Sequence, residues 1–187
     1  MALTPMVLTG RLIKKQKPDA KVVFIGPCAA KKLEASRKSV RSDVDFVLTF
    51  EEVMGMFEAK GINLPQVEAD APFEEGTANG RGFAVSGGVA NAVKQCIQKE
   101  HPDKEVLIDS AEGLKNCRTM LMMAKAGKRN GYLLEGMACP GGCVAGAGTL
   151  QPVIKSSALV KKYTNDAEKK LAFESEYLDN LDLLTKE

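Results

Sequence analysis

Five cysteines are the residues most able to do chemistry in this sequence of 187 residues. Cys139 and Cys143 bracket Pro-Gly-Gly, so a tight turn can bring both sulfurs to one side. The small residues leave room for a bulky ligand, and exposed backbone N–H groups can donate to sulfide, which favours an iron–sulfur cluster. The alternative is a glycine-rich turn with two incidental thiols, because this spacing is not the C-x2-C of zinc ribbons or redox pairs.

A third cysteine, Cys28, follows a short apolar run and precedes two cations, Lys31 and Lys32. Cations at this distance stabilise a thiolate and favour an anionic ligand. Cys28 could therefore supply a third sulfur to a cluster. The alternative is that the two lysines are solvated residues at the start of a helix.

The remaining residues of these types favour structural roles. Cys96 and Cys117 fall inside predicted helices and are interpreted as small helix residues. His101 is the single histidine and is interpreted as a surface residue. Five methionines on predicted helices are expected in the core: Met54, Met56, Met120, Met122 and Met123.

The elements that must position the cysteine loops alternate along the chain. Short apolar runs predict strands, the first of them buried, at 21–25, 45–48, 106–108 and 131–134. Caps and glycine stops, with Thr4 and Ser110 as two of the N-caps, predict helices at 5–16, 50–60, 88–99, 110–126 and 165–184. This alternation predicts an α/β fold of parallel β-α units. Both cysteine loops follow predicted strands, where sites of such sheets lie.

Composition excludes several classes of function. Hydrophobic residues at 44% and charged residues at 27% are typical of a folded globular chain. A net charge of +2 is too small an excess of positive charge to indicate nucleic-acid binding. No apolar run approaches the roughly 20 residues of a membrane span, and the start lacks a signal-peptide pattern. We therefore expect a cytoplasmic protein with neither nucleic acid nor membrane as a partner.

Taken together, the two cysteine loops resemble the iron-only hydrogenase large-subunit family. Its motifs read roughly PCxxKKxE and ExMxCPGGCxxGGGQP, and this chain has GPCAAKKLE and later EGMACPGGCVAGAG. The stretches RSDVDFVLTFEEV, RGFAVSGGVANAV and EGLKNCRTMLMMAKAG resemble further segments, so the resemblance spans residues 20–155. It implies one lobe, and part of a second, of the hydrogenase catalytic domain over residues 1–155, followed by a helical tail at 156–187.

The resemblance implies a cofactor and its ligands. In this family four cysteines bind a 4Fe–4S cluster, and one of them bridges to a two-iron subcluster that carries CO and cyanide. This H-cluster reversibly reduces protons to H2. The resemblance places Cys28, Cys139 and Cys143 as three of the four ligands, with Cys143 as the bridging cysteine.

The resemblance also implies residues around the two-iron unit. Lys31 would interact with a cyanide ligand, and Met137 would pack beside the two irons. Phe83 would line the same pocket, by its position in GFAVSGG. Glu34 is either an outer partner of this site or a surface carboxylate.

The chain departs from the family pattern at three places. The motif TSCCPxW, which supplies the fourth cluster cysteine and the proton-relay cysteine, is absent. Gly26 stands where the family often has Met, and GAGTLQP is two residues longer than GGGQP. We therefore expect a fragment, lacking its N-terminal side, of a divergent member.

Expectations about partners and activity follow from the fragment. Its partner would be the upstream remainder of the polypeptide, and the parent would exchange electrons with a ferredoxin-like protein. We expect the isolated chain to lack the 4Fe–4S cluster and the two-iron subcluster, to be inactive alone and to form a homodimer through exposed apolar surface. The alternatives are a non-catalytic relative, either a sensor or a cluster-assembly protein, and an α/β module that binds a partner and no metal.

Overall fold

A computed structural model describes residues 3–68, 70 and 76–185. The chain forms two compact units, each built from segments that are distant in sequence. The first unit comprises the described parts of Met1–Pro72, Gly146–Leu150 and Glu176–Glu187, and the second comprises those of Phe73–Ala145 and Gln151–Ser175. These units are made of several segments each, whereas the sequence predicted a single boundary at residue 155. That predicted boundary between a domain and a tail stays a prediction.

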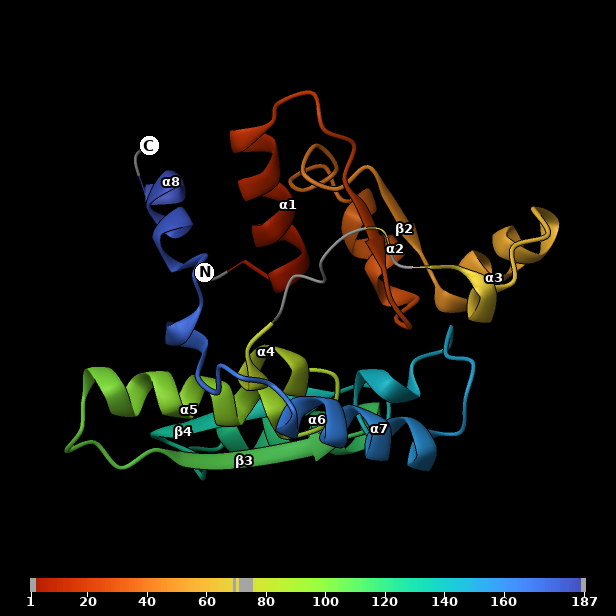
Figure 1. Cartoon of the computed structure of the whole chain (residues 1–187). Helices are drawn as coiled ribbons and strands as arrows, with labels where there is room; N and C mark the ends of the chain where they lie inside the picture. The colour runs from red at the N-terminus through yellow and green to blue at the C-terminus, as the bar shows by residue number, and fades with distance from the viewer. Residues whose placement is uncertain (1–2, 69, 71–75, 186–187) are drawn as a thin grey trace. The chain divides into compact units, whose positions relative to one another are not determined.

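The first unit contains a parallel pair of short strands and the helices that flank them (Figure 1). Val23 pairs with Phe46 and Ile25 with Leu48. The elements are α1 (Pro5–Gln16), β1 (Val23–Ile25), α2 (Ala30–Ser36), β2 (Phe46–Leu48), α3 (Phe50–Ala59), η1 (Leu64–Gln66), η4 (Leu178–Leu181) and α8 (Asp182–Thr185).

Packing of α1 against β2 and the residues just before it makes the core of this unit. Met6 and Val7 of α1 pack with Val44 and Val47, and all four are buried. Arg11 of α1 also pairs with the buried carboxylate of Asp43 at 2.9 Å, which satisfies a charge that burial would otherwise penalise.

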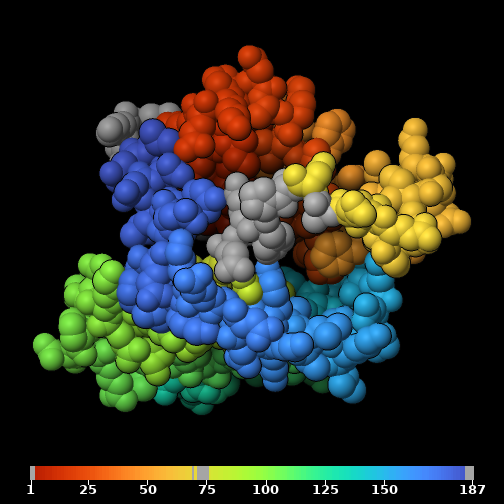
Figure 2. Space-filling model, viewed as in Figure 1, coloured from red at the N-terminus to blue at the C-terminus, as the bar shows by residue number. Residues whose placement is uncertain are grey.

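The second unit contains a longer parallel pair of strands, with α5 packed along β4 and α6 along β3 (Figure 1). Its elements are α4 (Ala78–Gly82), α5 (Gly88–Glu100), β3 (Leu107–Glu112), α6 (Leu114–Lys125), β4 (Tyr132–Met137), η2 (Cys143–Ala145), α7 (Val153–Asn165) and η3 (Ala172–Glu174). In the space-filling view α7, in light blue, lies on the surface of this unit (Figure 2). The predicted parallel α/β organisation is confirmed.

Two strands run further than the sequence predicted, and this changes the site. β3 continues through Ser110, which pairs with Glu135 and therefore does not cap a helix; α6 begins only after Gly113. β4 continues to Met137, three residues beyond the predicted end. The ladder between the two strands supplies hydrogen bonds that outweigh the local capping preference of serine.

The segment 165–184 is not the one helix that was predicted, because the structure has only the short elements η3, η4 and α8 there. α7 ends at Asn165, and Lys170 then donates to the carbonyl oxygens of Asn165 and Ala167, which closes the helix end. The Glu174 carboxylate accepts from the backbone N–H groups of Lys170 and Leu171. Side chains thus satisfy backbone groups that a continuous helix would have paired.

Burial also differs from expectation. Val23 and Ile25 are about half exposed and Phe46 is 60% exposed, so the face of the first strand pair that they share is open, whereas a buried strand was predicted. Of the five methionines expected in the core, Met120 is buried, but Met54, Met56 and Met122 are exposed. Within the described residues, helix length and hydropathy give no candidate for a membrane span.

Candidate functional site

The first cysteine loop lies at the carboxyl end of β1. Gly26 and Pro27 end the strand, Cys28 is half-buried, and α2 begins at Ala30. The Cys28 carbonyl accepts from the N–H of Lys31 at 3.2 Å, so the first turn of the helix fixes the backbone of the cysteine. The chain therefore places Cys28 and Lys31 in one rigid turn.

Lys31 is paired within this loop. Its ammonium lies 2.5 Å from the Glu34 carboxylate, and both side chains are largely buried. The other Glu34 oxygen accepts from the Thr4 hydroxyl, and Thr4 accordingly makes no cap hydrogen bond to α1, contrary to its predicted role. Burial raises the pKa of Glu34, but the hydrogen bonds from Lys31 and Thr4 outweigh it, so the pKa lies below the usual value of a glutamate.

Lys32 points to a different carboxylate. It lies 2.7 Å from Glu52, which also accepts from the N–H of Thr49 and completes the capping box of α3. These hydrogen bonds lower the pKa of Glu52 to about 2, and the bond from Lys32 has the largest effect. Both lysines beside Cys28 thus have carboxylate partners, so the net positive charge around the thiol is smaller than the sequence suggested.

The stretch that follows Cys143 in the chain returns to the first unit. Gly148 donates to the carbonyl oxygen of Pro27 at 2.9 Å, and its own carbonyl accepts from the N–H of Glu51. The glycine-rich segment after Cys143 is thereby held next to the residue that precedes Cys28.

The second cysteine loop lies at the carboxyl end of β4. Gly141 and Gly142 have φ of +97° and +92°, and the Gly142 N–H donates to the carbonyl of Cys139. Cys143 then opens the single turn η2. Because a β-carbon is strained at such angles, the two glycines are what allow the chain to reverse between the cysteines.

The loop is hydrogen-bonded to the segment 84–86. Val144 donates to the carbonyl of Ala84 at 2.9 Å, and Ser86 donates to the carbonyl of Gly141 at 3.3 Å. A β-carbon on Gly142 would lie 2.6 Å from the Ser86 nitrogen, so there is no room for a side chain. Phe83, at the end of α4, is half-buried and directly precedes this segment.

A buried carboxylate holds the start of α5, which directly follows this segment. Glu135 of β4 is 8% exposed and accepts from the N–H of Gly87 at 2.5 Å and of Ala90 at 2.9 Å. A carboxylate at a helix N-terminus satisfies unpaired N–H groups and the helix dipole. Glu135 therefore ties α5 to the strand that ends at the cysteines.

A second carboxylate holds the loop itself. Glu112, the last residue of β3, accepts from the Gly141 N–H at 2.9 Å and from the Ser86 side chain. The hydrogen bond from Ser86, with that from Gly141, holds the pKa of Glu112 below its usual value.

The sequence analysis assigned no role at the site to Glu112 or Ser86, and it noted Glu135 only as part of the Glu-Gly-Met motif. The stretch LIDSAE does not alternate apolar and polar residues, so no local periodicity extended the predicted strand to Glu112. A carboxylate in the apolar context of YLLEGM was itself a signal, because a buried charge needs partners.

The two cysteines interpreted as helix residues, and the single histidine, belong to the second unit. The Cys117 thiol donates to the carbonyls of Ala111 and Met137, at 3.4 and 3.6 Å, beneath the ends of both strands. Cys96 lies within α5 and is half-buried, and His101 is exposed at the end of that helix.

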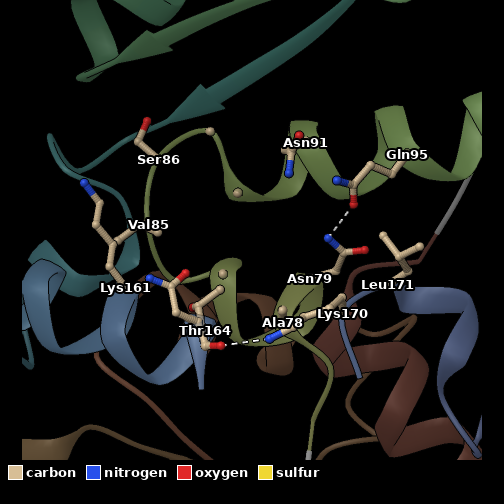
Figure 3. A pocket seen from close by; sticks show the side chains of 14 residues that line it. Ala78, Asn79, Val85, Ser86, Asn91, Gln95, Lys161, Thr164, Lys170 and Leu171 are labelled. Carbon is tan, nitrogen blue, oxygen red and sulfur yellow. Dashed lines mark hydrogen bonds between the residues drawn. The ribbon is translucent and has the colours of Figure 1, made fainter. Parts of the chain in front are cut away.

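A polar cavity of about 450 Å³ adjoins the Ser86 segment (Figure 3). Asn79 donates to Gln95 across one wall at 2.7 Å, as the dashed line in Figure 3 shows. The Thr164 hydroxyl is buried there without a hydrogen-bond partner in the described structure. Among the described residues that line this cavity there is no cysteine.

The thiols fit an iron–sulfur group by their chemistry. None of the five cysteines is in a disulfide, and thiolates are the ligands that such clusters prefer. Cys28 lies in the first unit and the Cys139–Cys143 pair in the second. Among the described residues, no group of three or more His, Cys, Asp or Glu side chains is placed to hold a metal ion.

The fold and its loops define an α/β protein in which strand ends carry cysteine turns. The family model of the iron-only hydrogenase large subunit, C-terminal domain, matches residues 1–147, and the chain belongs to this family.

Curated relatives include two hydrogenases and an assembly protein. The chain is 31% identical to the periplasmic Fe hydrogenase large subunit of Nitratidesulfovibrio vulgaris, over 81% of this chain and 45% of that protein. It is 33% identical to the NADP-reducing hydrogenase subunit HndD of Solidesulfovibrio fructosivorans, over 80% of this chain and 32% of that protein. It is 30% identical to the cytosolic iron-sulfur assembly component 3 of Pongo abelii, over 69% and 35%. The chain thus spans less than half the length of these relatives.

Solved structures show the same fold. A FeFe-hydrogenase, studied for oxygen inactivation of its H cluster, aligns with a TM-score of 0.66 and 18% identity over 94% of this chain and 62% of that chain. A variant of the FeFe-hydrogenase HydA1 from Chlamydomonas reinhardtii aligns with a TM-score of 0.64 and 18% identity, over 95% and 64%.

Proposed function

We propose that this chain is the cysteine-bearing part of an iron-only hydrogenase catalytic domain whose parent reversibly reduces protons to H2. The observation that carries the proposal is the turn between Cys139 and Cys143, which two glycines at positive φ make possible and which hydrogen bonds with Ala84 and Ser86 hold in place. An incidental pair of thiols needs no such support. The family match over both cysteine loops agrees with it.

Each residue has a part in this proposal. Cys28, Cys139 and Cys143 would hold the 4Fe–4S cluster, Cys143 would be shared with the two-iron unit, and a fourth ligand would come from the upstream remainder of the polypeptide. When bound, the two-iron unit supplies the redox chemistry of hydrogen. Lys31 donates to a cyanide ligand, and Glu34 holds its ammonium in place through the 2.5 Å contact. Phe83 and Met137 line the two-iron unit and exclude water.

The partners of the parent also stay proposals. A ferredoxin-like protein would supply or accept electrons, since this chain has no C-x2-C-x2-C run for relay clusters. The isolated chain would be inactive, and self-association through the open face of Val23, Ile25 and Phe46 would show as a concentration-dependent mass.

Anaerobic iron and sulfide reconstitution of the whole chain tests the cysteine assignment. We expect bound iron that is lost in Cys28→Ser and in Cys139→Ser/Cys143→Ser, whereas Cys96→Ser keeps it. Cys96 is the matched control because it is also half-buried but belongs to α5 and to neither cysteine loop. Iron uptake that ignores Cys139 and Cys143, or no specific iron, would contradict the assignment.

A second candidate is a non-catalytic iron–sulfur protein, favoured by the likeness to the assembly component of Pongo abelii. The two candidates differ in the two-iron unit. A synthetic diiron complex with CO and cyanide should bind the reconstituted hydrogenase chain, and its infrared bands should shift again in Lys31→Ala. An assembly protein or sensor without a two-iron site would leave the spectrum of the complex unchanged.

A further inference from the structure

Three hydrogen bonds connect Glu112, Ser86 and Gly141 to one another, and Gly141 belongs to the cysteine turn. The carboxylate accepts from the Gly141 N–H at 2.9 Å and from the Ser86 side chain. The Ser86 N–H in turn donates to the carbonyl of the same Gly141. Both backbone polar groups of Gly141 are thus engaged: its N–H by Glu112, and its carbonyl by Ser86, which Glu112 also holds.

The position of this contact makes it relevant to the cysteines. Gly141 is the central residue of Cys-Pro-Gly-Gly-Cys, and Glu112 is half-buried, so its charge is only partly screened by water. Backbone N–H groups in cysteine turns normally donate to cluster sulfur, and their orientation and nearby charges tune the reduction potential. Here one of these N–H groups is directed to a carboxylate instead.

We propose that Glu112 is a positioning residue of the cysteine turn: it fixes the Gly141 peptide and sets a negative charge beside Cys139 and Cys143 that lowers the potential of a cluster bound there. The positioning part is a property of the protein alone, and the effect on potential rests on the proposed function. A nearby negative charge favours the more positively charged, oxidised cluster, which gives the sign of the effect.

Amide hydrogen exchange of the metal-free chain, read by NMR at Gly141, tests the positioning. Glu112→Ala should speed exchange of the Gly141 amide about tenfold or more, since a hydrogen bond to a charged group is lost. Glu112→Gln keeps an acceptor of the same shape and should retain most of the protection. Glu105→Gln, an exposed glutamate just before β3, is the matched control and should change nothing. Exchange at Gly141 that is the same in Glu112→Ala and in the native chain overturns the proposal.

The potential of the reconstituted chain tests the charge. Glu112→Gln should shift it to more positive values at unchanged iron content, while Glu105→Gln leaves it unchanged. A merely structural role would not produce this shift in a variant whose Gly141 protection is intact. An unshifted potential overturns the electrostatic part of the proposal. A native chain that takes up no iron contradicts the proposed function instead, and the exchange data still decide whether Glu112 positions the turn.

Discussion

Replacing Gly142 by alanine should destabilise the second unit through two separate effects. The first is conformational: φ is +92°, where a β-carbon costs about 1–2 kcal/mol. The second is steric, because the new carbon would lie 2.6 Å from the Ser86 nitrogen and 2.9 Å from the Val85 carbonyl carbon. Both are backbone atoms that cannot turn away, so overpacking adds about 1–3 kcal/mol.

Gly131→Ala separates the two effects. Gly131 has φ of +80° in the same unit, but nothing lies within 4 Å of where its β-carbon would be. Gly131→Ala has the same conformational cost in the folded state as Gly142→Ala. It also has the same gain from a stiffer unfolded chain. Both contributions therefore cancel when the two variants are compared. The steric part alone should lower the melting temperature of Gly142→Ala by a further 2 to 12 °C or so. Thermal melts followed by circular dichroism measure this, and melting temperatures that agree within about 1 °C would refute the close contact.

Three further predictions concern carboxylates. Glu52 has a folded pKa of about 2 against a usual 4.5, so its stabilisation is present above pH 4.5 and lost as pH falls toward 2; Glu52→Gln should flatten the pH dependence of the melting temperature in that range. Glu135→Ala should cost about 1.5–3 kcal/mol in urea unfolding, since two buried N–H groups lose a charged acceptor, and Glu135→Gln should cost less. Lys31→Met should raise the pKa of Glu34 in an NMR titration, because burial remains while the largest opposing hydrogen bond is lost; an unchanged pKa would refute the pairing.

The fold class could be read from the sequence because local signals agreed with it. The predicted helices at 5–16, 50–60 and 88–99 match α1, α3 and α5 almost residue for residue. Each has a local signature, such as proline at the first helical position or the capping box of α3. Strand ends and burial could not be read in the same way, because they depend on pairing with a distant strand.

The contacts of the candidate site were only partly readable. Motifs identified both cysteine loops, but not that Lys31 pairs with Glu34 or that Thr4 donates to the same carboxylate. Thr4 and Glu34 are thirty residues apart, and no local rule connects them. The residues that hold the cysteine turn, Glu112 and Ser86, were missed for the same reason.

The length of β4 explains the spacing of Glu135 and Met137. With Met137 inside the strand, the two residues lie on one face, because side chains alternate along a strand. That face meets the N-terminus of α5, which Glu135 holds through Gly87 and Ala90. Gly136 lies on the opposite face, where its β-carbon would be 3.4 Å from the Cys117 sulfur. The spacing Glu-x-Met before the cysteine turn thus places Met137 on the face of β4 that meets the segment after Phe83. The opposite face of β4 packs against α6. If Met137 followed the strand in a loop, as the sequence alone suggested, this spacing would have no such consequence.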